Sequence, residues 1–169
     1  MAKQNNKLTI REITLFAILG ALTFALQVAM APLPNIEPVS LLVMIFAAVF
    51  GWKCLYAVSV FVVMEILFYG ISTWNIYYLY VWAVLALGAI MIRKQRSSLI
   101  WAMLSGAFGL FFGALCGIVD IFIGGFGYAA AKWVSGIPFD LAHCAGNFVI
   151  ALVAFRPLRR LLESLYARV

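Results

Sequence analysis

The chain has 169 residues, of which 66% are hydrophobic and 11% are charged, and its mean hydropathy is +1.08. Soluble domains carry about a quarter charged residues, so the composition excludes a soluble domain and predicts an all-α integral membrane protein. The net charge of +6 follows from membrane topology and anionic headgroups, and it requires no nucleic acid partner.

Apolar stretches separated by polar, proline or glycine residues predict a six-transmembrane-helix bundle, because each span needs about 20 apolar residues. All but one of the 12 Lys and Arg residues then lie on one side, and the exception is Lys132. By the positive-inside rule, both termini are cytoplasmic. Residues 1–169 form one membrane domain with spans near residues 12–31, 38–51, 54–70, 75–92, 98–123 and 137–155.

The first predicted span carries alanines at four-residue spacing, Ala17, Ala21 and Ala25. Small residues at this spacing let another helix approach closely. The stripe either packs inside the bundle or offers a docking face to another membrane protein, and the pattern does not separate these two roles.

The connection after this span reads "APLPNIEPVS" (residues 31–40) and is predicted to lie on the outer side of the membrane. Its three prolines fix φ and remove backbone donors, which makes a stiff non-helical segment. The segment also contributes Asn35 and Glu37. It is either a plain connecting loop or a rigid lid over an outward-facing cavity.

Three further acids fall near the outer ends of predicted spans: Glu65 in the third, Asp120 in the fifth and Asp140 in the sixth. Ionisable residues within spans are costly and usually face a cavity or the bundle interior. Each of them is therefore a candidate ligand-binding residue.

Aromatic residues gather at the same level. Trp74, Tyr77, Tyr78 and Trp82 begin the fourth span, and Trp133 precedes the sixth. An interfacial aromatic belt explains such a pattern without a ligand. Rings beside carboxylates also suit a planar or cationic solute, so both interpretations stay open.

The fifth and sixth spans carry different signals. The fifth span contains glycines at spacings typical of close helix packing, namely Gly106, Gly109, Gly113 and Gly117.

The sixth span contains the stretch "SGIPFDLAHCAGNFVIAL", in which we expect Pro138 in a first helical turn. Asp140, His143 and Asn147 follow at i, i+3 and i+7, so they share one helix face.

Together these observations predict one ligand site in the outer half of the bundle. Its candidate residues are Asn35, Glu37, Glu65, Trp74, Tyr77, Tyr78, Asp120, Trp133, Asp140, His143 and Asn147.

The three cysteines, Cys54, Cys116 and Cys144, have no C-x-x-C spacing, so we predict buried thiols and neither a metal site nor a cofactor in this chain.

Several stretches resemble a known family. They are "AILGALTFA", "PLPNIEPVSLL", "YLYVWAV" and above all "SGIPFDLAHCAGNFVIALVAFRPL". They are similar to the substrate-binding S components of energy-coupling factor (ECF) vitamin transporters. The resemblance implies a protein of a bacterial or archaeal cytoplasmic membrane that captures a vitamin or related micronutrient outside. It also implies docking on a membrane coupling protein with two ATPases, so this chain itself is not an enzyme.

The family's A-x-x-x-A docking motif matches Ala17 and Ala21, with Ala25 extending it, and its gating loop matches the segment from Pro32 to Pro38. Two other functions remain as alternatives. One is a small intramembrane enzyme that uses Asp120, Asp140 and His143 as acid and base. The other is a proton-coupled carrier that works alone, with Glu65 or Asp140 as relay.

Overall fold

A computed structural model describes residues 8–33 and 36–168, and this part of the chain forms helices and no strand. The prediction of an all-α fold is confirmed for it. The elements are α1 (Ile10–Met30), α2 (Val39–Phe50), the 3-10 turn η1 (Gly51–Lys53), α3 (Cys54–Tyr69), α4 (Thr73–Met91), α5 (Ser98–Leu110) and α6 (Phe112–Tyr166).

Within residues 8–33 and 36–168, four helical segments are long and apolar enough to cross a membrane. They are Ile10–Met30, Val39–Tyr69, Thr73–Met91 and Ser98–Tyr166. Two of them are much longer than one span requires. The first of these is divided at η1, where Gly51 has φ 60°, a left-handed conformation that favours glycine.

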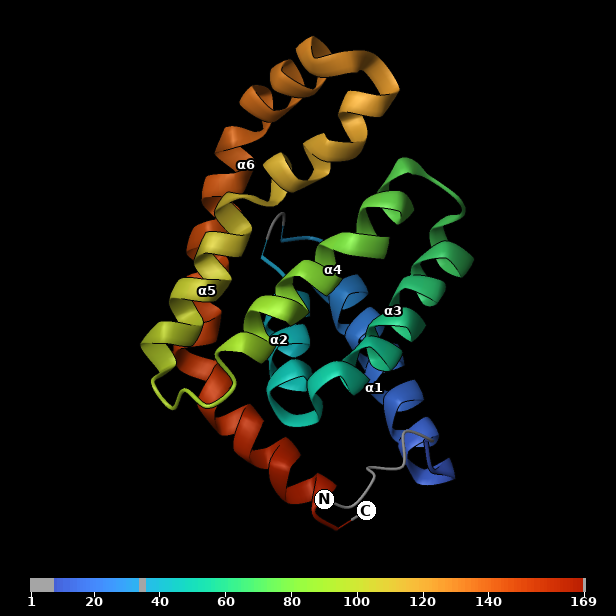
Figure 1. The fold of residues 1–169 in the computed structure, drawn as a ribbon, viewed down its shortest axis with the longest axis vertical. Coiled ribbons are helices and arrows are strands. Elements are labelled where there is room, and N and C mark those ends of the chain that lie inside the picture. The colour runs from blue at the N-terminus through green and yellow to red at the C-terminus, as the bar shows by residue number, and fades with distance from the viewer. Residues whose placement is uncertain (1–7, 34–35, 169) are drawn as a thin grey trace.

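The largest difference from the sequence prediction concerns residues 98–137. A single span over 98–123 is expected, but α5 ends at Leu110 and the chain bends at Phe111. A second break follows at Gly125 (φ 80°), which divides α6 into a first leg, residues 112–124, and a second leg, residues 126–166. Figure 1 shows the first leg turning away from α5 before the chain returns along the long second leg.

Because the second leg begins directly after Gly125, the prediction that Pro138 occupies a first helical turn is wrong. Pro138 and Pro157 both lie inside α6. The connection expected between the fifth and sixth spans is helical instead, and this places Lys132 and Trp133 on a helix.

The bundle has two ends, which we call terminal and distal. At the terminal end, Glu12 is buried and accepts hydrogen bonds from Lys53 Nζ (2.6 Å) and Tyr166 OH (3.1 Å). Glu12 also completes a capping box with Thr9 that starts α1. This contact joins the beginning of α1, the α2–α3 corner and the end of α6. The distal end lies around Tyr77, Asp120 and Lys132.

Helix α2 occupies the centre, since nine of its 12 residues are buried. Helix α1 packs on α3, and Gly20 permits this contact because a Cβ there would lie 2.5 Å from the Ala57 carbonyl oxygen. Two glycines of α5, Gly106 and Gly109, permit a similar approach to the second leg of α6. The predicted stripe does not continue to Gly117, because the chain bends at Phe111 and a Cβ at Gly117 would meet no neighbouring helix of the described chain. At Gly109 the nearest atoms are backbone atoms of His143 and Cys144.

We expect Gly109→Ala to destabilise the protein. The added Cβ would lie 2.8 Å from three backbone atoms of α6, so the helices must separate. Such overpacking costs about 1 to 3 kcal/mol, to be measured as a lower Tm in detergent. Gly117→Ala is the matched control, because, apart from its own helical turn, no heavy atom of the described residues lies within 4 Å of the new Cβ. Equal Tm values for the two variants would contradict the close-packing interpretation.

Candidate functional site

A cavity of about 340 Å³ opens at the distal end, between the beginning of α4 and the two legs of α6. Its walls are mostly apolar and aromatic, with a few charged groups. Five predicted site residues lie in these walls: Trp74, Tyr77, Asp120, Trp133 and Asp140. The other lining residues are Phe112, Gly113, Cys116, Lys132, Gly136 and Phe139. A pocket of this kind is typical of small-molecule sites.

Asp140 is the most distinctive polar group of this cavity. It is 6% exposed, and its Oδ1 accepts a hydrogen bond from the backbone N–H of Gly113 (3.1 Å). Its Oδ2 is buried and forms no hydrogen bond of good geometry with the described residues, although the Trp133 side chain lies close enough to interact with this carboxylate. A Cβ at position 113 would lie 2.6 Å from Oδ2, so the glycine leaves room for the carboxylate. A buried acceptor without a partner is costly, and a ligand donor would satisfy it.

Lys132 forms the second polar feature of the cavity. Its Nζ lies 2.8 Å from Asp120 Oδ1 and donates to the Tyr77 hydroxyl at 2.9 Å. Tyr77 in turn donates to the same carboxylate oxygen. The lysine therefore neutralises Asp120 and leaves Asp140 as the unpaired acid of the cavity wall. Lys132 is not among the predicted site residues. Its position could have indicated a role, because it is the one basic residue on the predicted outer side, where the acidic residues lie.

Glu37 and His143 meet beside the cavity. Glu37 Oε1 lies 3.6 Å from His143 Nε2, and the His143 ring packs against the cavity residue Phe112 at 5.1 Å between centroids. Glu37 belongs to the proline-rich connection, so this connection reaches the second leg of α6. Asn35, its other predicted site residue, lies outside the described residues.

Further polar atoms are buried without a hydrogen-bond partner among the described residues. They include Gln27 Oε1, Glu65 Oε1, Trp82 Nε1 and His143 Nε2. Glu65 and Glu37 are close enough to interact electrostatically. Neither Gln27 nor Trp82 is among the predicted site residues. Trp82 belongs to the aromatic group that begins the fourth span, whereas the single amide of Gln27 inside an apolar helix gives no spacing signal.

Asn147 and Tyr78 lie apart from the cavity lining. Asn147 shares the buried face of Asp140 and His143, as its spacing predicts. However, its Nδ2 donates to Ser40 Oγ (3.0 Å) and to the Ser105 carbonyl (3.4 Å), so it joins α6 to α2 and α5. Tyr78 packs between Phe61 and Trp82 inside the bundle.

The alanine stripe of α1 faces outward. Ala17 and Ala25 are exposed and Ala21 is half-buried, whereas Phe16 and Gly20, about 100° around the helix axis from Ala17 and Ala21, are buried. Of the two roles left open for the stripe, the structure favours an external face over internal packing.

The three cysteines form no disulfide among the described residues. Cys54 and Cys116 are buried and Cys144 is half-buried, and all three thiols are free. The part of the chain that the structure describes contains no group of three or more His, Cys, Asp or Glu side chains placed to hold a metal ion.

Comparison with known proteins adds no assignment: no family, no curated protein and no solved structure matches this chain.

Proposed function

We propose that this protein is the substrate-binding membrane subunit of an ECF-type importer, which captures a vitamin or related micronutrient outside the cell. The observation that carries the proposal is the distal cavity, with its aromatic walls and the unpaired carboxylate oxygen of Asp140. In this proposal the energy comes from a separate module of one membrane coupling protein and two ATPases.

The proposal includes six membrane crossings and cytoplasmic termini. The segment Val39–Tyr69 counts as two crossings because η1 divides it, and Ser98–Tyr166 counts as two because it reverses direction at the distal end. With α1 and α4, the total is six. Lys and Arg residues concentrate at the terminal end, which supports its placement in the cytoplasm. The cavity then opens to the outside.

The cavity chemistry favours a planar heteroaromatic ligand that carries a cationic or N–H donor group. Trp74 and Trp133 offer aromatic rings, which stack on planar groups and attract cations, whereas the Tyr77 ring is already covered by Lys132, whose Nζ lies 5.3 Å from the ring centroid. Asp140 offers an acceptor, while the charge of Asp120 is already compensated by Lys132. We further propose that the proline-rich connection covers the bound ligand, since Glu37 from this connection lies 3.6 Å from His143.

The test has two steps. Native mass spectrometry of protein purified from rich medium should detect a copurifying small molecule, bound without chemical change. That molecule, labelled, should then enter proteoliposomes only when an ECF module and internal ATP are both present.

Uptake driven by a proton gradient without ATPases would contradict the proposal and would support a stand-alone carrier, for which the buried Glu65 is the obvious relay. Conversion of the molecule by the purified chain would support an intramembrane enzyme.

A further inference from the structure

A second pocket lies at the terminal end, where the connection between α4 and α5 meets α6. Its volume is about 250 Å³. Four guanidinium groups and a single carboxylate surround it, so its charge is strongly positive. The lining residues are Gln95, Arg96, Phe155, Arg156, Arg159, Arg160 and Glu163.

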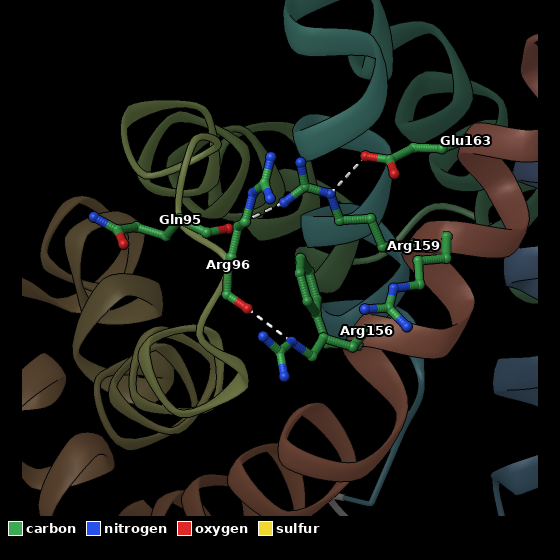
Figure 2. A pocket seen from close by; sticks show the side chains of 7 residues that line it. Gln95, Arg96, Arg156, Arg159 and Glu163 are labelled. Atoms are coloured by element: carbon green, nitrogen blue, oxygen red, sulfur yellow. Dashed lines mark hydrogen bonds and ion pairs between the residues drawn. The ribbon is translucent and has the colours of Figure 1, made fainter.

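Backbone carbonyl groups hold two of these arginines in place. Figure 2 shows Arg156 and Arg159 reaching from α6 toward the α4–α5 connection. Arg156 Nε donates to the Arg96 carbonyl at 2.7 Å, and Arg159 Nη1 donates to the Gln95 carbonyl at 3.2 Å. A carbonyl oxygen orients a guanidinium group without cancelling its charge. The site is therefore built before any anion arrives.

Only one of the four arginines is neutralised by an acid of the described chain. Arg159 pairs with Glu163 at 2.8 Å. Within residues 8–33 and 36–168, Arg96, Arg156 and Arg160 form no ion pair. Three positive groups thus remain available around one pocket, and forked guanidinium donors match the geometry of a phosphate.

The pocket also lies at the edge of the apolar part of the bundle. Helix α4 ends at Met91, α5 begins at Ser98, and the apolar part of α6 ends with Phe155. Val149, Leu152 and Val153 are exposed on α6. Leu152 precedes Arg156 by four residues, and Val149 precedes Val153 by four, so an exposed apolar strip leads toward the arginines.

We propose that this pocket binds the phosphodiester headgroup of an anionic phospholipid, with the acyl chains lying along Val149, Leu152 and Val153. The arginines account for the phosphate, and the adjoining apolar strip favours a lipid over a free phosphate ion. Basic pockets between helices at the cytoplasmic face bind such headgroups.

Binding should be measured on the full chain, purified in detergent and stripped of lipid. The probes are phosphatidylglycerol, the zwitterionic phosphatidylcholine and inorganic phosphate, with bound lipid counted by native mass spectrometry. Arg156→Gln and Arg160→Gln should each weaken phosphatidylglycerol binding about fivefold, since one basic residue near a membrane surface contributes about that factor. Phosphatidylcholine should bind far more weakly than phosphatidylglycerol to the unmodified protein.

Lys94→Gln is the control, because it removes the same charge from the same connection without lining the pocket. An equal loss in this control would overturn the proposal in favour of diffuse surface charge. If millimolar inorganic phosphate displaces bound phosphatidylglycerol as effectively as added phosphatidylglycerol does, the pocket is a site for free phosphate and the lipid proposal is overturned. Absence of any preference for phosphatidylglycerol would also overturn the proposal. Arg160→Gln keeps the test valid if Arg156→Gln disturbs folding, because Arg156 donates a hydrogen bond to the Arg96 carbonyl whereas Arg160 makes no hydrogen bond or ion pair with the described residues.

Discussion

Replacing Asp140 with asparagine should weaken ligand binding by about five- to a hundredfold, because a ligand donor that loses its charged acceptor forfeits roughly 1 to 3 kcal/mol. The substitution keeps the shape of the side chain and the acceptor for the Gly113 N–H, so the cavity wall should remain in place. It removes the negative charge at the one carboxylate of the cavity that has no basic partner. Titration with the copurified ligand measures the effect.

Two variants on the same helix serve as controls. Ala142 is exposed, so Ala142→Leu should leave both affinity and Tm unchanged. Asn147→Ala should lower the Tm, since it leaves the buried Ser40 hydroxyl without its donor, while affecting affinity much less than Asp140→Asn does. If Asp140→Asn lowers only the Tm, Asp140 is a structural residue and the ligand must bind elsewhere.

Placing a tryptophan in the alanine stripe should abolish ATP-dependent uptake and leave ligand binding intact. Ala21→Trp or Ala17→Trp adds a large ring to an outward face whose small residues would let a partner helix approach closely. The distal cavity is lined by α4 and α6 and not by α1, so the affinity for ligand should not change. Uptake into proteoliposomes that contain the ECF module measures docking, and ligand titration of the isolated chain measures binding.

Leu22→Trp is the matched control for this experiment. Leu22 is 46% exposed on the same helix, about 100° away from Ala21 around the helix axis. This variant should transport normally. Normal uptake by both alanine variants would contradict the docking assignment, and an equal loss in Leu22→Trp would point to a general effect of bulk on α1.

The sequence by itself determined the all-helical fold, the presence of helices long and apolar enough to cross a membrane, and several local features. Apolar stretches of sufficient length leave no alternative to helices in lipid, because every backbone group must be paired within its own segment. The common face of Asp140, His143 and Asn147 and the common face of the three alanines follow from helix periodicity alone, whereas only the structure shows that the alanine face points outward. The acidic residues predicted at one end of the spans include Asp120 and Asp140, two of the three charged residues that line the distal cavity.

The tertiary structure decided which of these residues act together. The bends at Phe111 and Gly125 bring Lys132 back to Asp120 and Tyr77. A bend of this kind depends on how the two legs pack and not on hydropathy. The same holds for Asn147, whose partners Ser40 and Ser105 lie 107 and 42 residues away. Helix periodicity specifies a direction around one axis, but only the packing of several helices specifies what a side chain meets in that direction.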